Sequence, residues 1–144
     1  MKKFMTFILS AMILAPIAFA DDKPFDFNKL PSVAKEFLSK YFPNDKVIAA
    51  TVDDDLVRPD YEVLLMSGAK VGFEHSGALE KVEMREGAVP VGVVPEQIVV
   101  YLSAHYPEVA IVEYEVGKND FEVKLTNGLE LKFNSAFKLI GIDD

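Results

Sequence analysis

The sequence has 144 residues, of which 50% are hydrophobic and none is cysteine, and its formal net charge is −8. This acidic balance argues against nucleic acids and anionic membrane surfaces as partners, because both repel a negative protein. Without cysteine no disulfide can form, so the fold must be stabilised by the burial of apolar side chains. The chain is long enough to build an adequate core for one domain.

The first twenty residues have the pattern of a secretory signal peptide. Lys2 and Lys3 form a basic start, residues 4–15 an apolar stretch, and Ala18-Phe19-Ala20 a small-x-small cleavage pattern. The apolar stretch is shorter than the roughly 20 residues that a membrane-spanning helix needs. No cysteine follows it that could carry a lipid anchor. We therefore expect cleavage after Ala20 and a periplasmic or secreted protein with 13 basic and 23 acidic side chains, a net charge of −10.

Two segments, residues 31–43 and 95–107, have the apolar spacing of short amphipathic helices. In each, apolar residues recur every three or four positions, so one face of the helix faces a core. A proline opens each segment, where its missing N–H costs nothing. An aromatic residue and a second proline end it, because proline disfavours the helical conformation of the residue before it.

Strand-like runs with alternating apolar and polar residues follow each helix. Turns such as Ser67-Gly68 and Asn127-Gly128 separate them, and Asn-Gly between alternating runs is a strong hairpin signal. Inward-facing residues such as Phe73 and Phe133 give each group of strands a face that can cover its helix. The predicted strands lie near residues 46–54, 60–67, 69–75 and 78–84, and near 109–117, 119–127, 129–135 and 137–142.

The two halves of the chain match position by position, as in Pro31 with Pro95, Phe37 with Tyr101, Pro43 with Pro107 and Phe73 with Phe133. Residues that recur in this way are architectural more often than chemical. We expect an α+β fold made by tandem duplication of one helix followed by a four-stranded antiparallel sheet, the two repeats forming one structural domain. The expected divisions are a signal peptide at 1–20, a flexible leader at 21–29, a first repeat at 30–83, a linker at 84–93 and a second repeat at 94–144.

The combination of Phe37-Leu38-x-x-Tyr41-Phe42-Pro43, Tyr61-Glu62-Val63 and Asn127-Gly128-Leu129-Glu130-Leu131-Lys132-Phe133 resembles the PepSY-like, beta-lactamase-inhibitor-like proteins secreted by Bacteroides-type bacteria. The likeness covers nearly all of the chain after residue 20. It implies a tandem helix-plus-sheet fold in a periplasmic or cell-surface binder or inhibitor, without catalytic residues. One position departs from the family, since Phe137 stands where Gly77 stands in the first half. Either that turn has another shape or Phe137 is an exposed aromatic.

Residues that could carry catalysis or bind a metal are few. There are two histidines, at positions 75 and 105, and no pair of them has the spacing of a zinc site. No Gly-x-Ser-x-Gly nucleophile motif and no glycine-rich phosphate loop is present. Asp53, Asp54 and Asp55, with Asp60 nearby, are weak candidates for a calcium site, because clustered carboxylates suit hard cations. Their spacing does not fit an EF-hand loop, and a solvated loop is the favoured interpretation. We expect no cofactor and no metal.

The outer face of the first group of strands, opposite the helix, is unusually apolar. Strand alternation places Val47, Ala49, Leu64 and Met66 there, whereas the matching positions of the second half are mostly polar, as in Lys124 for Leu64 and Thr126 for Met66. Such a patch is either a binding surface or a place where another part of the chain packs. The apolar linker at residues 87–93 is the favoured cover.

These observations favour a secreted, periplasmic, non-enzymatic binding module, with an inhibitor role that depends on the sheet surface. The candidate residues for contact with a protein partner are Val47, Ala49, Leu64, Met66 and Phe137. The alternative is an extracytoplasmic protein that binds a small ligand or a cation. An enzyme is disfavoured, because the sequence offers no nucleophile or acid with an orienting partner. The oligomeric state stays open.

Overall fold

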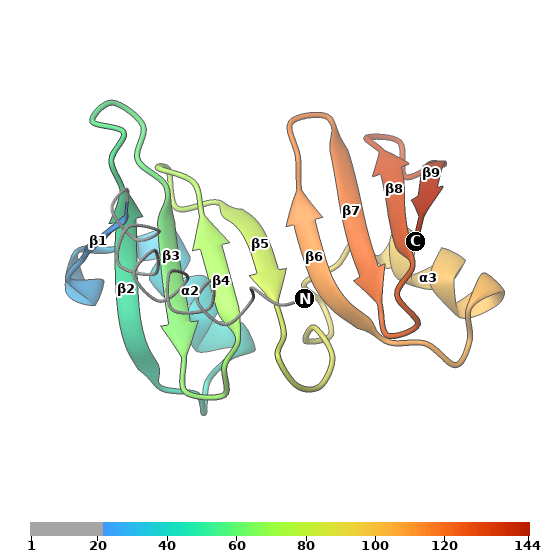
Figure 1. Ribbon diagram of the computed structural model, residues 1–144, viewed down its shortest axis with the longest axis horizontal. Helices are drawn as coiled ribbons and strands as arrows, with labels where there is room; N and C mark the ends of the chain where they lie inside the picture. Colours follow the sequence, from blue (N-terminus) through green and yellow to red (C-terminus); the bar gives the residue numbers. More distant parts are fainter. Residues whose placement is uncertain (1–21) are drawn as a thin grey trace, which may run out of the picture.

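The computed structural model describes residues 22–144 (Figure 1). The predicted signal peptide and its cleavage site after Ala20 lie outside the described residues and stay predictions. Two α-helices are present in the described part, α2 at Ser32–Tyr41 and α3 at Glu96–His105, together with a short 3₁₀ helix, η1, at Phe27–Lys29. The C-cap of each α-helix, Phe42 or Tyr106, is an aromatic residue that precedes a proline, as predicted.

The eight predicted strands are all present, and a ninth precedes them. The bounds are β1 Asp22–Pro24, β2 Val47–Asp53, β3 Tyr61–Leu65, β4 Lys70–Phe73, β5 Leu79–Glu83, β6 Ile111–Val116, β7 Asp120–Leu125, β8 Glu130–Asn134 and β9 Leu139–Asp143. Each strand pairs antiparallel with the next, so the spatial order is the chain order.

The predicted tandem of two four-stranded sheets is wrong. The strands form a single nine-stranded antiparallel sheet, because β5 pairs with β6 through Lys81 opposite Glu115, Val82 opposite Tyr114 and Glu83 opposite Glu113. A strand edge that ends in solvent leaves main-chain groups unpaired, and pairing the two inner edges removes that cost. Sequence periodicity reports which side of a strand is buried but not which strand lies beside it, so the pattern did not reveal this pairing.

The leader also differs from the expectation of a flexible segment at residues 21–29. Asp22–Pro24 pair with β2, and the N–H of Phe25 donates to the carbonyl of Ala50 at 2.8 Å. The Phe25 ring packs against Tyr61 with the ring centres 5.0 Å apart. Burial of this aromatic side chain holds the leader against the sheet.

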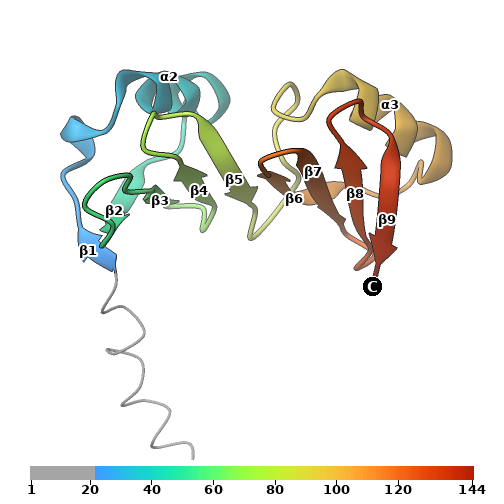
Figure 2. The same ribbon diagram turned by 90° about the horizontal axis from the view of Figure 1, so that it is seen from above.

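Both helices cover the same face of the sheet, and the opposite face carries no helix in the described part of the chain (Figure 2). The core lies between the helices and the sheet, and Phe73 and Phe133 are fully buried in it. Each ring meets a helix aromatic edge to face, Phe37 at 5.7 Å and Tyr101 at 5.5 Å between ring centres. No helix in residues 22–144 is long and apolar enough to cross a membrane.

Candidate functional site

The helix-free face of the sheet, which we call the open face, carries the candidate site. Its apolar part is a depression of about 470 Å³ over the start of β2 and the end of β3. Ile48, Leu64 and Met66 line it, and Ile48 and Met66 are 54% and 62% exposed. Ala49 lies opposite Leu64 and is exposed as well. We call Ile48, Ala49, Leu64 and Met66 the apolar patch.

The linker does not cover the apolar patch. Val89 and Val94 of the linker region are buried in the core, on the helix side of the sheet. The N–H of Val89 donates to the carbonyl of Ile111 at 2.8 Å, and Tyr41 of α2 donates to the carbonyl of Gly92 at 3.4 Å. The expectation that the linker lies across the outer face is therefore wrong. Val89 and Val94 are buried beside α3, where they remove apolar surface from water, whereas Val91 is 97% exposed.

Val47 does not belong to the apolar patch, although strand alternation placed it there. A bulge between Val47 and Ala49 shifts the register, so Val47 lies opposite Leu65 and packs against the core. The extra residue, Ile48, is exposed in its place. A bulge inserts one residue without a partner and reverses the faces on one side of it. Sequence reasoning missed Ile48 because it assumed strict alternation.

Phe137 lies away from the open face. It has a positive φ of 65° in the β8–β9 turn and stacks on Phe121, with ring centres 5.4 Å apart, against the core. The turn has the same shape as the β4–β5 turn, where Gly77 has a φ of 94°. In both turns the N–H of that residue donates to the residue three before it, Asn134 or Glu74, at 2.8 Å. The structure thus places Phe137 as a half-buried aromatic in a turn of unchanged shape.

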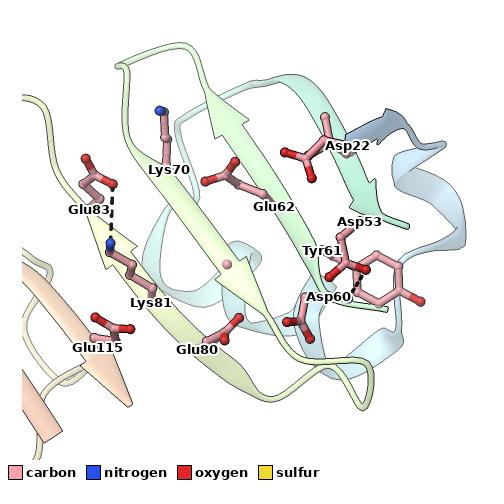
Figure 3. Close-up of a pocket in the computed structure, with 12 residues that line it drawn as sticks. Asp22, Asp53, Asp60, Tyr61, Glu62, Lys70, Glu80, Lys81, Glu83 and Glu115 are labelled. Atoms are coloured by element: carbon pink, nitrogen blue, oxygen red, sulfur yellow. Dashed lines mark hydrogen bonds and ion pairs between the residues drawn. The ribbon is translucent and has the colours of Figure 1, made fainter. Parts of the chain in front are cut away.

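An acidic depression of about 280 Å³ lies beside the apolar patch on the same face. Most of its charged side chains are carboxylates, and two lysines interrupt them (Figure 3). Lys81 lies 3.0 Å from Glu113 and 4.0 Å from Glu83. We call this set, Asp22, Asp53, Asp60, Glu62, Glu80, Glu83 and Glu115 with Lys70 and Lys81, the acidic depression.

Partial burial, and after it the charge of neighbouring carboxylates, raises the pKa of two members of the acidic depression. Partial burial raises the pKa of Asp60, and the negative charges of Asp53 and Glu74 raise it further. Partial burial and then the charges of Asp60 and Glu74 raise the pKa of Glu80 in the same direction. Like charges held close together disfavour ionisation, so the acidic depression is an unbalanced negative surface.

Each aspartate of the run at residues 53–55 makes a local contact. The Asp53 carboxylate accepts the N–H groups of Asp55 and Asp60, both at 3.2 Å. Asp55 accepts those of Val57 at 2.9 Å and Arg58 at 3.1 Å, and these bonds lower the pKa of Asp55. Asp54 lies 2.8 Å from Lys23 of β1. Among the described residues no group of three or more Asp, Glu or His side chains is placed to hold a metal ion.

The same hydrogen bonds shape the loop between β2 and β3, whose tip presents Leu56 and Val57 almost fully to solvent. In Figure 1 this loop extends beyond the end of the sheet. Sequence reasoning missed Leu56 and Val57. Their position between the aspartate run and Arg58-Pro59 could have indicated two apolar side chains at the tip of a loop.

Glu62 and Glu122, which occupy matching positions in the two halves, lie on the open face. Glu122 lies 3.4 Å from Lys132, which is also 3.9 Å from Asp120. Glu62 lies opposite Gly72 and lines the acidic depression with Lys70. Glu122 thus forms a cross-strand charge pair of the kind that stabilises sheets.

The fold and the open face define an α+β protein with helices on one side of an antiparallel sheet and an uncovered, charged and apolar surface on the other. The chain belongs to the PepSY-like family: the family model described as "Putative beta-lactamase-inhibitor-like, PepSY-like" matches residues 59–141. This confirms the resemblance drawn from the sequence.

Solved structures from Bacteroides are similar to nearly the whole of this chain. A putative periplasmic protein of the DUF2874 family from Bacteroides vulgatus is 39% identical, with a TM-score of 0.83 over 87% of this chain and 98% of its own. A "putative calcium-regulated periplasmic protein" from Bacteroides thetaiotaomicron is 37% identical, with a TM-score of 0.82 over 85% and 97%. A putative periplasmic protein of unknown function from Bacteroides vulgatus is 30% identical, with a TM-score of 0.80 over 85% and 99%. A comparison with curated proteins finds no match.

Proposed function

We propose that this protein is a periplasmic, non-enzymatic binding module that holds a protein partner against its open face and acts as an inhibitor. The observation that carries the proposal is the exposed apolar patch directly beside the acidic depression. Exposed apolar patches on soluble proteins mark interaction sites. The periplasmic location is supported by the predicted signal peptide and by the descriptions of the similar Bacteroides proteins.

The charge of the open face defines the partner. Seven carboxylates against two lysines give the acidic depression a local excess of negative charge, which a basic surface would relieve. Ile48 and Met66 would supply the apolar centre of the contact, and methionine adapts its shape to irregular surfaces. The partner is therefore a protein that presents apolar side chains within a basic rim. The inhibitor role is supported by the family description alone.

The test is a double variant, Leu64→Lys with Met66→Thr, which copies Lys124 and Thr126 of the second half. Both side chains lie on the open face, so we expect the free energy of unfolding to change by about 0.5 kcal/mol. Capture of a basic partner from periplasmic extract should fall at least about tenfold. The control, Val33→Thr with Val100→Lys, introduces the same two residue types at helix positions that are 55% and 59% exposed, and it should capture normally. Equal capture by both variants would contradict the proposal.

Cation binding is the second candidate, and one observation favours it: a relative with 37% identity is described as calcium-regulated. The carboxylates of the acidic depression would supply the oxygen ligands, and because no three of the described ones are placed together to hold a metal ion, binding would require them to move. Two measurements on the same protein preparation, the Tm with calcium and the capture of a basic protein, distinguish the two candidate functions. A rise in Tm with calcium in the absence of any partner would favour the cation, because a ligand that binds only the folded state stabilises it. An unchanged Tm with intact capture of a basic protein would favour the first proposal.

A further inference from the structure

Strand β9 forms one edge of the sheet, and within residues 22–144 no strand pairs with its far side. Its pairing with β8 is geometrically the same as that of β5 with β4. Gly141 and Ile142 lie opposite Lys132 and Leu131, as Lys81 and Val82 lie opposite Gly72 and Val71, and both pairs of strands have a bulge at the same place. The far side of β5, however, is occupied by β6. Among residues 22–144 no strand therefore takes the position beside β9 that β6 takes beside β5.

Main-chain geometry shows which N–H and C=O groups of β9 point to this edge. The N–H of Met84 donates to the carbonyl of Val112 at 2.8 Å, so Met84 turns its main-chain groups toward β6. Alternate residues of an antiparallel strand face the same edge, so Val82 does likewise. Ile142 stands in the position of Val82 and faces the free edge with its N–H and C=O. Val82 is fully buried beside Tyr114, whereas Ile142 is 54% exposed.

The two edge strands of the sheet differ in how well they are protected against pairing with strands of other chains. Strand β1 has only three residues, and Pro24 among them has no N–H to offer. Strand β9 has five residues, contains no proline and exposes two isoleucines, Ile140 and Ile142. Soluble proteins usually block such an edge, because it accepts strands from other chains.

We propose that β9 pairs antiparallel with β9 of a second copy of this chain, about a two-fold axis at Ile142. This arrangement closes after two copies, whereas pairing of β9 with β1 of another copy would continue without end. It buries the side chain of Ile142 against its own symmetry mate. The two copies then share one continuous antiparallel sheet, with all of the open face on one side.

The charges at this edge are compatible with this partner. In its own sheet Asp143 lies opposite Glu130, a pair of like charges. A two-fold axis at Ile142 places Asp143 opposite Gly141 of the second copy. The side chain of Lys132 passes beside that glycine, its Cβ 3.8 Å from where a Cβ of residue 141 would stand. On its new side Asp143 therefore faces a glycine and no second carboxylate, and Lys132 of the other copy, which pairs with Glu122 in its own sheet, lies beyond that glycine.

The first experiment introduces a single cysteine, because the sequence contains none of its own. In Ile142→Cys the two Cα atoms of a dimer would lie about 5.5 Å apart, a separation that suits a disulfide. We expect rapid cross-linking to a dimer under mild oxidation. The control, Val33→Cys, has the same exposure, 55% against 54%, but lies on α2 and should remain monomeric. Equal rates of cross-linking in both variants would overturn the proposal.

The second experiment measures association without a covalent bond. Sedimentation velocity of the unmodified protein should show a concentration-dependent dimer, and Ile142→Lys should raise its Kd at least about tenfold while circular dichroism stays unchanged. A monomer at every concentration, or a dimer that Ile142→Lys does not weaken, would overturn the proposal. A growing series of larger species would instead indicate pairing of β9 with another edge, which also contradicts it.

Discussion

Gly77 and Phe137 occupy the same position in two turns of the same shape, and both have a positive φ. The two residues tolerate this backbone conformation for different reasons. Gly77 has no Cβ, and a Cβ added there would lie 2.8 Å from the Cβ of Pro31, at the start of α2. Phe137 accepts the strain of a left-handed backbone and offsets it by stacking on Phe121. The glycine is therefore required by the close approach of the helix as well as by the backbone.

A prediction at the residue scale follows from this contact. Gly77→Ala should lower the free energy of unfolding by more than Gly128→Ala, because residue 128 has the same positive φ, 91°, but no atom within 4 Å of an added Cβ. Strain alone costs about 1 kcal/mol, and the contact with Pro31 should roughly double this or more. Urea unfolding of the two variants measures the difference. Equal losses would show that the β4–β5 turn can move away from α2.

At the scale of an element, the bulge in β5 creates part of the candidate site. The register passes from Lys81 to Leu79, so Glu80 has no partner in β4. Its carboxylate lies in the acidic depression, partly buried among other carboxylates. Such a group destabilises the fold when it is charged, which is the usual cost of a surface adapted for binding.

Glu80→Gln should therefore stabilise the protein at neutral pH. Because the pKa of Glu80 is raised in the folded state, folding takes up a proton, and stability falls as pH rises from the ordinary value of 4.5 through the raised one. The variant should lose this part of the pH dependence, as measured by urea unfolding across that interval. Glu86→Gln, at an exposed position in the linker, is the control and should change neither value. A less stable Glu80→Gln variant would mean that Glu80 has a favourable contact in the fold.

At the scale of the whole molecule, the two halves are joined by three residue pairs between β5 and β6. Tyr114 lies at the centre of this junction opposite Val82, and only 3% of its surface is exposed. Burial raises the pKa of Tyr114 to about 12, since the ionised phenol would be poorly solvated there. Ionisation of Tyr114 would therefore destabilise the junction between the two halves.

Alkaline unfolding tests this destabilisation. Between the ordinary tyrosine pKa of 10.0 and about 12 the unfolded chain loses the Tyr114 proton before the folded chain does, so stability falls as pH rises. Tyr114→Phe should remove about 2–3 kcal/mol of this loss, whereas Tyr101→Phe, the control on α3, should not. Unfolding by urea at either end of that interval measures the effect. An identical alkaline loss in Tyr114→Phe would place its cause elsewhere in the molecule.

Local features of this protein followed from its sequence. Helical spacing and proline stops predicted α2 and α3, and alternation with Gly and Asn turns predicted β2 to β9, because these signals depend on neighbours within a few residues. The placement of Leu64 and Met66 on the outer face followed from the same alternation, whereas the absence of a cover over them did not. The family resemblance, which rests on those positions, is confirmed as well.

Tertiary structure alone decided how these elements are arranged. Pairing of Val82 with Tyr114 joined two expected sheets into one, and a bulge exchanged Val47 for Ile48 in the apolar patch. The linker runs on the helix side of the sheet, where Val89 is buried in the core, and it leaves the open face uncovered. Strand partners, bulges and the route of a connection depend on free-energy differences between distant segments, which no local pattern records. For that reason the sequence determined what each segment is, and the tertiary structure determined which surface remains open.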